Sequence, residues 1–167
     1  MDNRIAKVAL AMLQKNSGDI KRIEHSLKVF GYAQLLGAAE SLDENTSRIL
    51  ELTALLHDIG IHVAERKYGL SKSHDQEIEG PPVAREILVS LDFEPNVVER
   101  VCFIISKHHT FTAVDGIDFQ LLVEADFLVN SAEDQMSAQQ IVHFAKNIFK
   151  SKIGIIYLRL LFPNIEF

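Results

Sequence analysis

The stretch Glu51-Leu52-Thr53-Ala54-Leu55-Leu56-His57-Asp58-Ile59-Gly60-Ile61-His62 decides the fold of this chain. Apolar residues recur at helical spacing from Ile49 to Ile59, and Gly60 supplies a helix stop, so we expect His57 and Asp58 on the last turn of a core helix. Burying either side chain alone would be costly. Adjacent helical residues point about 100° apart, so the pair can meet one ion only with further ligands from elsewhere in the chain.

A histidine on the preceding predicted helix is the first candidate for such a ligand. Asp19 can cap this helix, and His25 lies on one line with Val29 and Leu36, so His25 is expected to face the interior. A lone histidine in that position is more often a satisfied core residue. The His57-Asp58 pair downstream reverses this preference.

An aspartate far along the chain is the second candidate. Asp126 lies in an apolar helical segment, four residues after Leu122 and three after Val123. A carboxylate on an apolar stripe is rarely left unpaired, which favours a metal ion or a buried cation as its partner. Glu124 falls on another face of the same helix and is expected to be solvated.

An upstream histidine (His25), a His57-Asp58 doublet followed by Ile59-Gly60, and a distant aspartate (Asp126) together resemble the pattern of the HD superfamily of metal-dependent phosphohydrolases. The resemblance covers roughly Ile23 to Asn130. It implies an all-α, single-domain helical bundle and a substrate that is a nucleotide or another small phosphorylated metabolite.

The expected metal ligands are His25, His57, Asp58 and Asp126. Two imidazoles and two carboxylates without a thiolate suit Mn, Fe, Co, Ni, Mg or Zn and leave positions for water. Such an ion would lower the pKa of bound water and neutralise charge on a phosphate. Asp58 would also steer the proton of that water, so we assign it a catalytic role as well.

A pair of histidines follows the doublet, at the end of the helix that Pro95 opens. His108 continues the apolar stripe of that helix, and it matches a paired-histidine element that in many HD enzymes binds a second metal or contacts the substrate phosphate. A helix C-terminus also favours histidine through its dipole, and for His109 this is the preferred interpretation. Gln76 stands where family members with two metals carry a histidine, so we expect one ion rather than two.

Substrate contacts are expected around the doublet. The family often has a lysine directly after His-Asp-Ile-Gly, but Ile61 stands there in this chain. His62, Arg66, Lys67 or Lys107 would have to supply the missing positive charge. The candidate substrate-binding residues are His62, Lys107, His109 and Glu79, while Glu77, Glu79 and His108 are the candidates for a general acid or base.

Length, composition and net charge limit the class of protein to which this chain can belong. The chain has 167 residues, 47% of them hydrophobic, which is the size of one domain with a sizeable core. A net charge of −6 argues against coating a nucleic acid or binding an anionic membrane. A small anionic substrate stays compatible, because a bound metal reverses the local field. The single Cys102 fits a reducing cytoplasm, where we expect the protein to reside. A homodimer is left open.

Periodic apolar segments predict about six to eight helices over residues 1–167, with a motif-bearing core at about 23–130 and C-terminal helices at 137–162 packed on it. The expected landmarks are a first helix from Asp2 to Lys15, a cap at Asp43, a polar loop from Ile61 to Asp75, a helix starting at Pro81 or Pro82, a cap at Asp118, a capping box at Ser137 and Gln140, an exposed His143, and a last helix from Ile153 to Phe162 that closes the core.

Three functions from different classes fit this sequence. The first is a phosphohydrolase with one metal ion. The second is a regulatory module that binds a nucleotide without turnover, and the presence of all four ligands argues against it. The third is a di-iron oxygenase of the HD fold, which needs more histidine ligands than the four residues supply, and Gln76 stands where one is expected.

Overall fold

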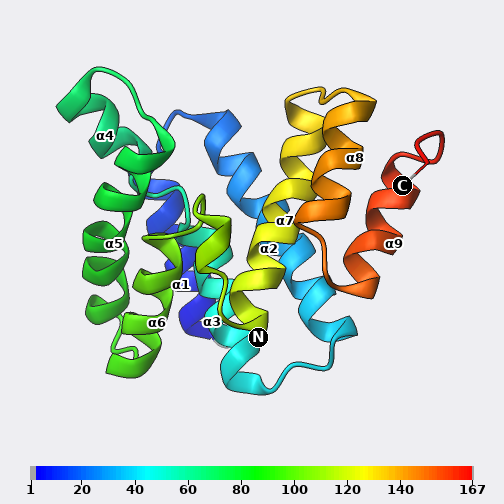
Figure 1. The fold of residues 1–167 in the computed structure, drawn as a ribbon. Coiled ribbons are helices and arrows are strands. Elements are labelled where there is room, and N and C mark those ends of the chain that lie inside the picture. The colour runs from blue at the N-terminus through cyan, green and yellow to red at the C-terminus, as the bar shows by residue number, and fades with distance from the viewer. Residues whose placement is uncertain (1–2, 167) are drawn as a thin grey trace.

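The computed structural model describes residues 3–166, and all regular structure in that range is helical (Figure 1). The elements are α1 (Asn3–Lys15), α2 (Ile20–Ala39), α3 (Glu44–Leu56), α4 (Ile61–Tyr68), α5 (Ser73–Ser90), α6 (Pro95–Ile105), the 3-10 helix η1 (Phe111–Ala113), α7 (Ile117–Glu133), α8 (Ala138–Asn147) and α9 (Lys152–Leu161). The all-α prediction is confirmed. The predicted start of the first helix at Asp2 lies outside the described residues.

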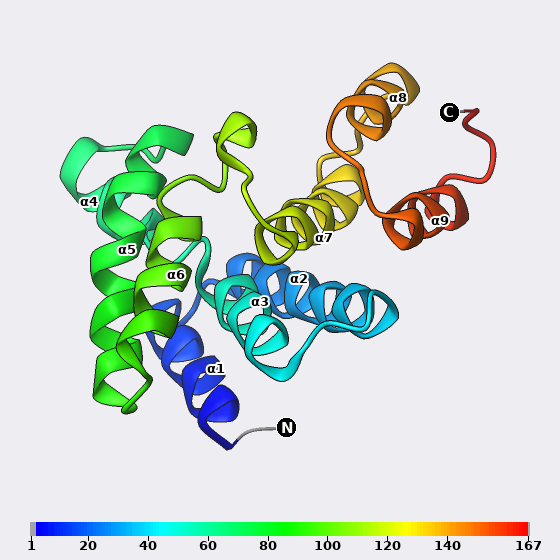
Figure 2. The ribbon, with the colours of Figure 1, turned by 60° about the horizontal axis from the view of Figure 1, so that its bottom comes forward.

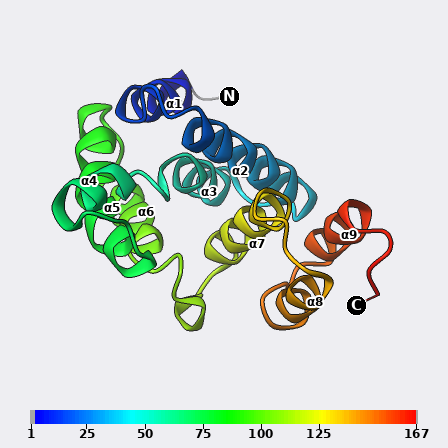
Figure 3. The ribbon, with the colours of Figure 1, turned by 90° about the horizontal axis from the view of Figure 1, so that it is seen from above.

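Helix α3, which ends at the His57-Asp58 doublet, lies at the centre of the bundle. It packs against α1, α2, α6 and α7, and the view in Figure 2 shows it surrounded by them. Its apolar residues, among them Leu52 and Leu56, are fully buried. Helices α4 to α6 stand on one side of this centre, whereas α8 and α9 stand on the other side, beyond α7 (Figure 3).

Polar side chains begin several helices where the sequence predicts. Asp19 accepts a hydrogen bond from the backbone nitrogen of Arg22, and Asp43 caps α3 through the backbone nitrogens of its first turn. Pro95 opens α6, and Ser137 with Gln140 forms the capping box of α8. These local signals fix where α2, α3, α6 and α8 begin in the sequence.

The segment from Ile61 to Asp75 is not the polar loop that the sequence analysis expects. Residues 61–68 form α4, which buries Ile61 and Ala64 against the core and ends at Gly69, whose φ of 80° suits glycine. Only two buried positions mark this helix, and charged residues occupy much of the rest. Its apolar pattern is therefore too short to distinguish it from a loop.

The predicted start of a helix at Pro81 or Pro82 is also wrong. Helix α5 begins at Ser73, where Asp75 accepts a hydrogen bond from the backbone of Lys72, and the two prolines lie in its middle. Proline suits a first turn but does not require one. Gly60 has a second role here, because a Cβ on Gly60 would lie 2.4 Å from the backbone nitrogen of Gly80 in α5. The missing side chain lets the doublet's turn approach that helix.

Two carboxylates on α7 differ from their predictions. Gly116, not Asp118, occupies the N-cap, and Asp118 lies in the first turn, where it accepts hydrogen bonds from Arg100 at 2.7 and 2.8 Å. Glu124 is not solvated but 0% exposed. It accepts hydrogen bonds from Gln120, from the backbone nitrogens of Lys150 and Ser151, and from the Ser151 hydroxyl. Glu124 therefore fastens the junction of α8 and α9 to α7.

The last helix closes the core only in part. Leu158 of α9 joins the same buried cluster as Ile141 and Ala145 of α8, while Ile156 and Leu160 are exposed. His143 is exposed, as predicted, and Cys102 is buried. Within residues 3–166, no helix combines the length and the apolar character needed to cross a membrane.

Candidate metal centre

Packing of α2, α3 and α7 brings the four predicted ligands together. His25 lies on α2, His57 and Asp58 directly follow α3, and Asp126 lies on α7. The Nε2 atom of His25 is 3.3 Å from His57 Nε2, 3.2 Å from Asp126 Oδ1 and 3.7 Å from Asp58 Oδ2. His57 Nε2 is 3.6 Å from the same oxygens of Asp58 and Asp126. His25, His57 and Asp58 thus present donor atoms close enough to one another to share a metal ion, and Asp126 Oδ1 lies beside both imidazoles.

The spacing of these atoms matches the edges of a metal coordination polyhedron. Bonds of about 2.0–2.2 Å place neighbouring ligand atoms roughly 2.8–3.1 Å apart in octahedral geometry and roughly 3.3–3.6 Å apart in tetrahedral geometry. The five distances between the donor atoms fall in or next to these ranges. The donors are imidazole nitrogens and carboxylate oxygens, so the residues fit a divalent cation.

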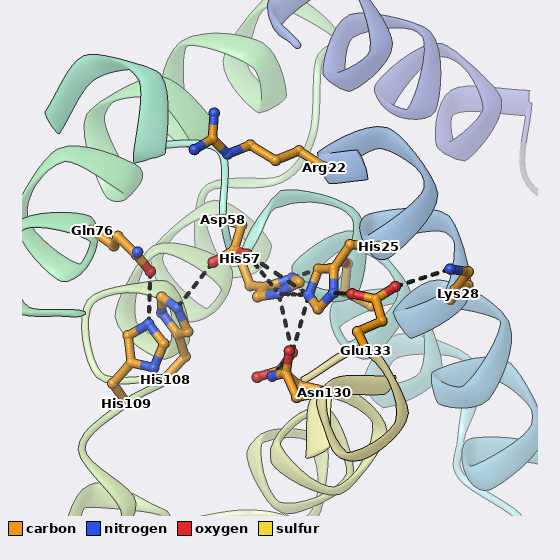
Figure 4. A network of polar contacts seen from close by, with 12 residues as sticks. Arg22, His25, Lys28, His57, Asp58, Gln76, His108, His109, Asn130 and Glu133 are labelled. Carbon is orange, nitrogen blue, oxygen red and sulfur yellow. Dashed lines mark hydrogen bonds and ion pairs between the residues drawn. The ribbon is translucent and has the colours of Figure 1, made fainter. Parts of the chain in front are cut away.

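Hydrogen bonds behind the cluster orient its histidines. The Nδ1–H of His25 donates to Glu133 at 3.0 Å, and that of His57 donates to the carbonyl of Ala54 at 3.0 Å, which leaves both Nε2 lone pairs facing the cluster (Figure 4). These tautomers are assigned from the hydrogen-bond partners. Lys28 donates to the same Glu133 at 2.9 Å. A carboxylate behind a histidine is the usual support of a metal ligand.

The electrostatics of the cluster favour positive charge. Burial of His57 opposes its protonation, but Asp58 and Asp126 outweigh that effect and raise its pKa from 6.5 to about 9. Burial acts against ionisation of the two carboxyls, yet the neighbouring imidazoles hold the pKa values of Asp58 and Asp126 well below their usual range. Both carboxylates are therefore ionised at neutral pH, as metal ligands must be.

A second group of donors lies on the other side of Asp58. His108 Nε2 is 3.6 Å from Asp58 Oδ1, is buried, and has no hydrogen-bond partner, while its Nδ1–H donates to the Ile105 carbonyl. His109 Nε2 is 2.7 Å from the side-chain oxygen of Gln76. Burial, with a contribution from His108, lowers the pKa of His109 to about 4, so His109 is neutral. Asp58 thus lies between His25 and His57 on one side and His108 and His109 on the other. Gln76 already contacts His109.

Two cavities open onto Asp58, Asn130 and Asp134. One has a volume of about 290 Å³ and is lined on its apolar side by Phe111, Phe127, Met136 and Phe144. The other has a volume of about 300 Å³ and is lined by charged residues that include Lys21, Arg22 and Glu133. The histidine–aspartate cluster therefore sits where an apolar and a charged cavity meet.

The predicted substrate-binding residues lie in different places. His109 lines the apolar cavity, and His62 lies behind Arg22, 3.4 Å from its guanidinium. Lys107 is exposed and lines neither cavity. Glu79 is buried and accepts hydrogen bonds from Lys67 at 2.5 Å and Tyr68 at 2.9 Å, which joins α4 to α5. Lys107 and Glu79 thus lie outside the lining of both cavities.

The structure also separates the three candidates for a general acid or base. Glu77 accepts hydrogen bonds from the backbone of His109 and from the Thr110 hydroxyl, so it positions the loop after α6. Glu79 is engaged between α4 and α5. His108 has an Nε2 atom without a hydrogen-bond partner, and this atom lies beside Asp58. His108 is therefore the candidate that the geometry favours.

Sequence reasoning missed Arg22, Asn130 and Glu133. Asn130 donates to Asp126 Oδ1 at 2.9 Å, and Glu133 supports His25. Both follow Asp126 at helical spacing, four and seven residues later, so they share its face. Arg22 precedes His25 by one turn and donates to Asp19 and Glu65 at 2.6 Å each. That spacing is the signal that could have identified all three.

Comparison with known families gives one match, to the HD domain, over residues 22–146. The matched range begins at Arg22 and includes His25, the doublet, His108, His109 and Asp126. No curated protein and no solved structure matches the chain.

Proposed function

The chain belongs to the HD-domain family, and from that membership and the geometry of the cluster we propose that it is a metal-dependent hydrolase of phosphate esters. The substrate would be a nucleotide or a related small phosphorylated metabolite. The observation that carries the proposal is the set of distances, 3.2–3.7 Å, among the Nε2 atoms of His25 and His57 and the facing oxygens of Asp58 and Asp126.

His25, His57, Asp58 and Asp126 would hold one divalent cation. Bound there, such an ion lowers the pKa of a coordinated water and withdraws charge from a phosphate oxygen. Glu133 and the Ala54 carbonyl keep the two imidazoles turned toward it, and Asn130 holds the Asp126 carboxylate. This ligand set is supported by the separate hydrogen bonds that orient three of its members, His25, His57 and Asp126.

The remaining residues suit roles in proton transfer and phosphate binding. His108 carries a free Nε2 atom beside Asp58 Oδ1. This nitrogen can accept the proton of the attacking water and then return it to the departing oxygen of the ester. Lys21 and Arg22 line the charged cavity and supply positive charge for the phosphate oxygens that point there. They take the place of the lysine that the family often has where Ile61 stands.

The test combines metal content with phosphate release. Elemental analysis of protein purified without a chelator should find about one metal ion per chain, and a screen of phosphate esters with Mn, Co, Mg, Ni or Zn should detect inorganic phosphate. His57→Ala should lose metal and activity while its helical circular dichroism persists. His143→Ala, which removes an exposed histidine of α8, is the matched control and should change neither.

Other outcomes would assign the alternatives. A nucleotide-dependent rise in melting temperature with no phosphate release would indicate a regulatory module. Two iron ions per chain with substrate-dependent oxygen consumption would indicate an oxygenase. Protein without bound metal under all these conditions, and without phosphate release, would refute the proposed hydrolase.

A further inference from the structure

The two cavities at the cluster differ in chemistry, which restricts the substrate more sharply than the family does. The charged cavity presents Lys21, Arg22 and Glu133. The other presents an apolar wall made by Phe111 of η1, Val123 and Phe127 of α7, Met136, Phe144 of α8, and Ile148 directly after α8. Its polar lining residues are Asp58, Gln76, His109, Asp126, Asn130 and Asp134. An ester bound at the cluster has room for a charged group in one direction and for an apolar group in the other.

The apolar wall is aromatic and partly uncovered. Phe127 and Phe144 stack with their ring centroids 4.3 Å apart and their planes at 33°. Phe111 stands on the loop after α6 and keeps 41% of its surface exposed. Core phenylalanines are usually buried, so an exposed phenylalanine that lines a cavity beside the cluster is a candidate for ligand contact.

The wall is also fixed in place. The carbonyl of Ile148 accepts a hydrogen bond from Gln120 at 2.8 Å, and Glu124 holds the backbone nitrogens of Lys150 and Ser151 at 2.8 and 2.9 Å. Through these bonds α7 positions the end of α8, which carries part of the wall. Because the cavity is already formed, ligand binding does not have to pay the entropy cost of ordering its walls. The fixed shape of the cavity then selects among ligands.

Resting on the proposed function, we propose that this cavity holds a flat aromatic ring of the substrate, and that Phe111 and Phe144 give the site its preference for aromatic over aliphatic phosphate esters. An aromatic ring can pack face to face or edge to face on these side chains. A sugar or polyol would instead place hydroxyls against a wall that offers them no hydrogen-bond partner. The cavity of about 290 Å³ suits one ring system rather than a long chain.

Binding measurements test the inference without turnover. Phenylphosphonate, methylphosphonate and inorganic phosphate are titrated calorimetrically into the full chain loaded with Mn. Phenylphosphonate should bind about tenfold or more tightly than methylphosphonate. Phe111→Ala and Phe144→Ala should remove most of that difference. Phe103→Ala is the matched control, because Phe103 is 39% exposed and lines neither cavity, and it should keep the difference.

Kinetics then identify the source of the ring. The ratio of kcat/KM for phenyl phosphate to that for ethyl phosphate is compared with the ratio for a nucleoside 5′-monophosphate to that for ribose 5-phosphate. At least one of these two ratios should be about ten or more. In Phe111→Ala that ratio should fall toward one, through a change in KM rather than in kcat. The larger ratio tells whether the ring belongs to an aryl ester or to a nucleobase.

The two proposals fail separately. Hydrolysis of all esters without an aromatic preference, or equal affinity for the two phosphonates, would overturn the inference and leave the hydrolase intact. A phenylphosphonate preference that depends on Phe111 but comes without phosphate release would support the inference and remove the hydrolase. If Phe144→Ala unfolds because Phe144 packs on Phe127, the comparison of the wild type with Phe111→Ala still tests the inference.

Discussion

Two carboxylates on different faces of α7, the buried Glu124 and the half-buried Asp126, are stabilised by different partners. Toward the junction of α8 and α9, Glu124 is 0% exposed and its oxygens accept four hydrogen bonds from neutral donors of the protein. Toward α2 and α3, Asp126 accepts one hydrogen bond from Asn130 and otherwise faces the Nε2 atoms of His25 and His57. Only the second face leaves room for an ion among its partners.

The contrast gives a rule for reading buried acids. A carboxylate whose lone pairs are taken by backbone and hydroxyl donors is a structural anchor, because an ion would have to displace those donors. A carboxylate that faces imidazole nitrogens attracts a proton or a metal to the space between them. Four variants and conditions would break or sharpen this distinction.

Asp126→Asn should have the largest effect. The amide keeps the shape of the side chain but loses the charge that a metal ligand must carry, so metal affinity should fall more than about 100-fold and turnover should fall with it. Metal stoichiometry and the metal-induced rise in melting temperature are the measurements, since ligand binding stabilises by a term that grows with the ratio of free metal to Kd. A metal-induced shift equal to that of the wild type would exclude Asp126 from the site.

Glu124→Gln should act on stability instead. Gln keeps one oxygen but places an amide where the Ser151 hydroxyl donates, so we expect the free energy of unfolding to fall by about 2–4 kcal/mol. That corresponds to a decrease in melting temperature of roughly 4–16 °C for a domain of this size. Metal stoichiometry should not change. Glu40→Gln, at an exposed position after α2, is the control, and a loss of metal in Glu124→Gln would contradict the assignment.

The same contrast shows what the sequence can and cannot predict. The sequence predicts a cluster of His25, His57, Asp58 and Asp126 because a histidine, a His-Asp doublet and an aspartate occur in a characteristic order on apolar helices, and packing of α2, α3 and α7 brings these residues together. The sequence pattern predicts a solvated Glu124 because it indicates one buried face, whereas α7 buries nearly all of its first twelve residues. The second buried face exists only because α8 and α9 fold back on it, which is a long-range fact.

Long-range packing also explains the other errors. α4 has two buried residues, Ile61 and Ala64, and is recognisable as a helix only beside α5. The prolines of α5 look like a helix start, but the helix is fixed earlier by Asp75 and later by the approach of Gly60 to Gly80. Capping signals such as Asp19 and Asp43 act over a few residues and were predicted correctly.

Glu133→Gln should have an intermediate effect on the metal. Glu133 contacts the ring of His25 and not the cluster itself, so replacing its charge should lower metal affinity about 10–100-fold while the ligands stay in place. Competition with a chelator of known affinity measures the change. Lys28→Met, which removes the other partner of Glu133, is the companion variant and should have a smaller effect because Lys28 is exposed. A larger effect in Lys28→Met than in Glu133→Gln would refute the proposed support of His25.

The pH dependence of stability should give the smallest effect. The pKa of His57 is raised from 6.5 to about 9 in the folded, metal-free protein. A raised pKa contributes stability that is fully present below pH 6.5 and is lost as the pH rises through 9, so the melting temperature of the chelator-treated protein should fall over that window. A metal ion needs the neutral imidazole, so the metal-induced stabilisation should instead grow over the same window. Asp126→Asn should flatten the dependence, because its carboxylate helps to raise the pKa of His57, whereas Glu124→Gln should lower the whole curve and keep its slope. If the metal-free melting temperature were constant from pH 6.5 to 9, the proton on His57 would not be linked to folding, and the two faces of α7 would not differ in the way proposed.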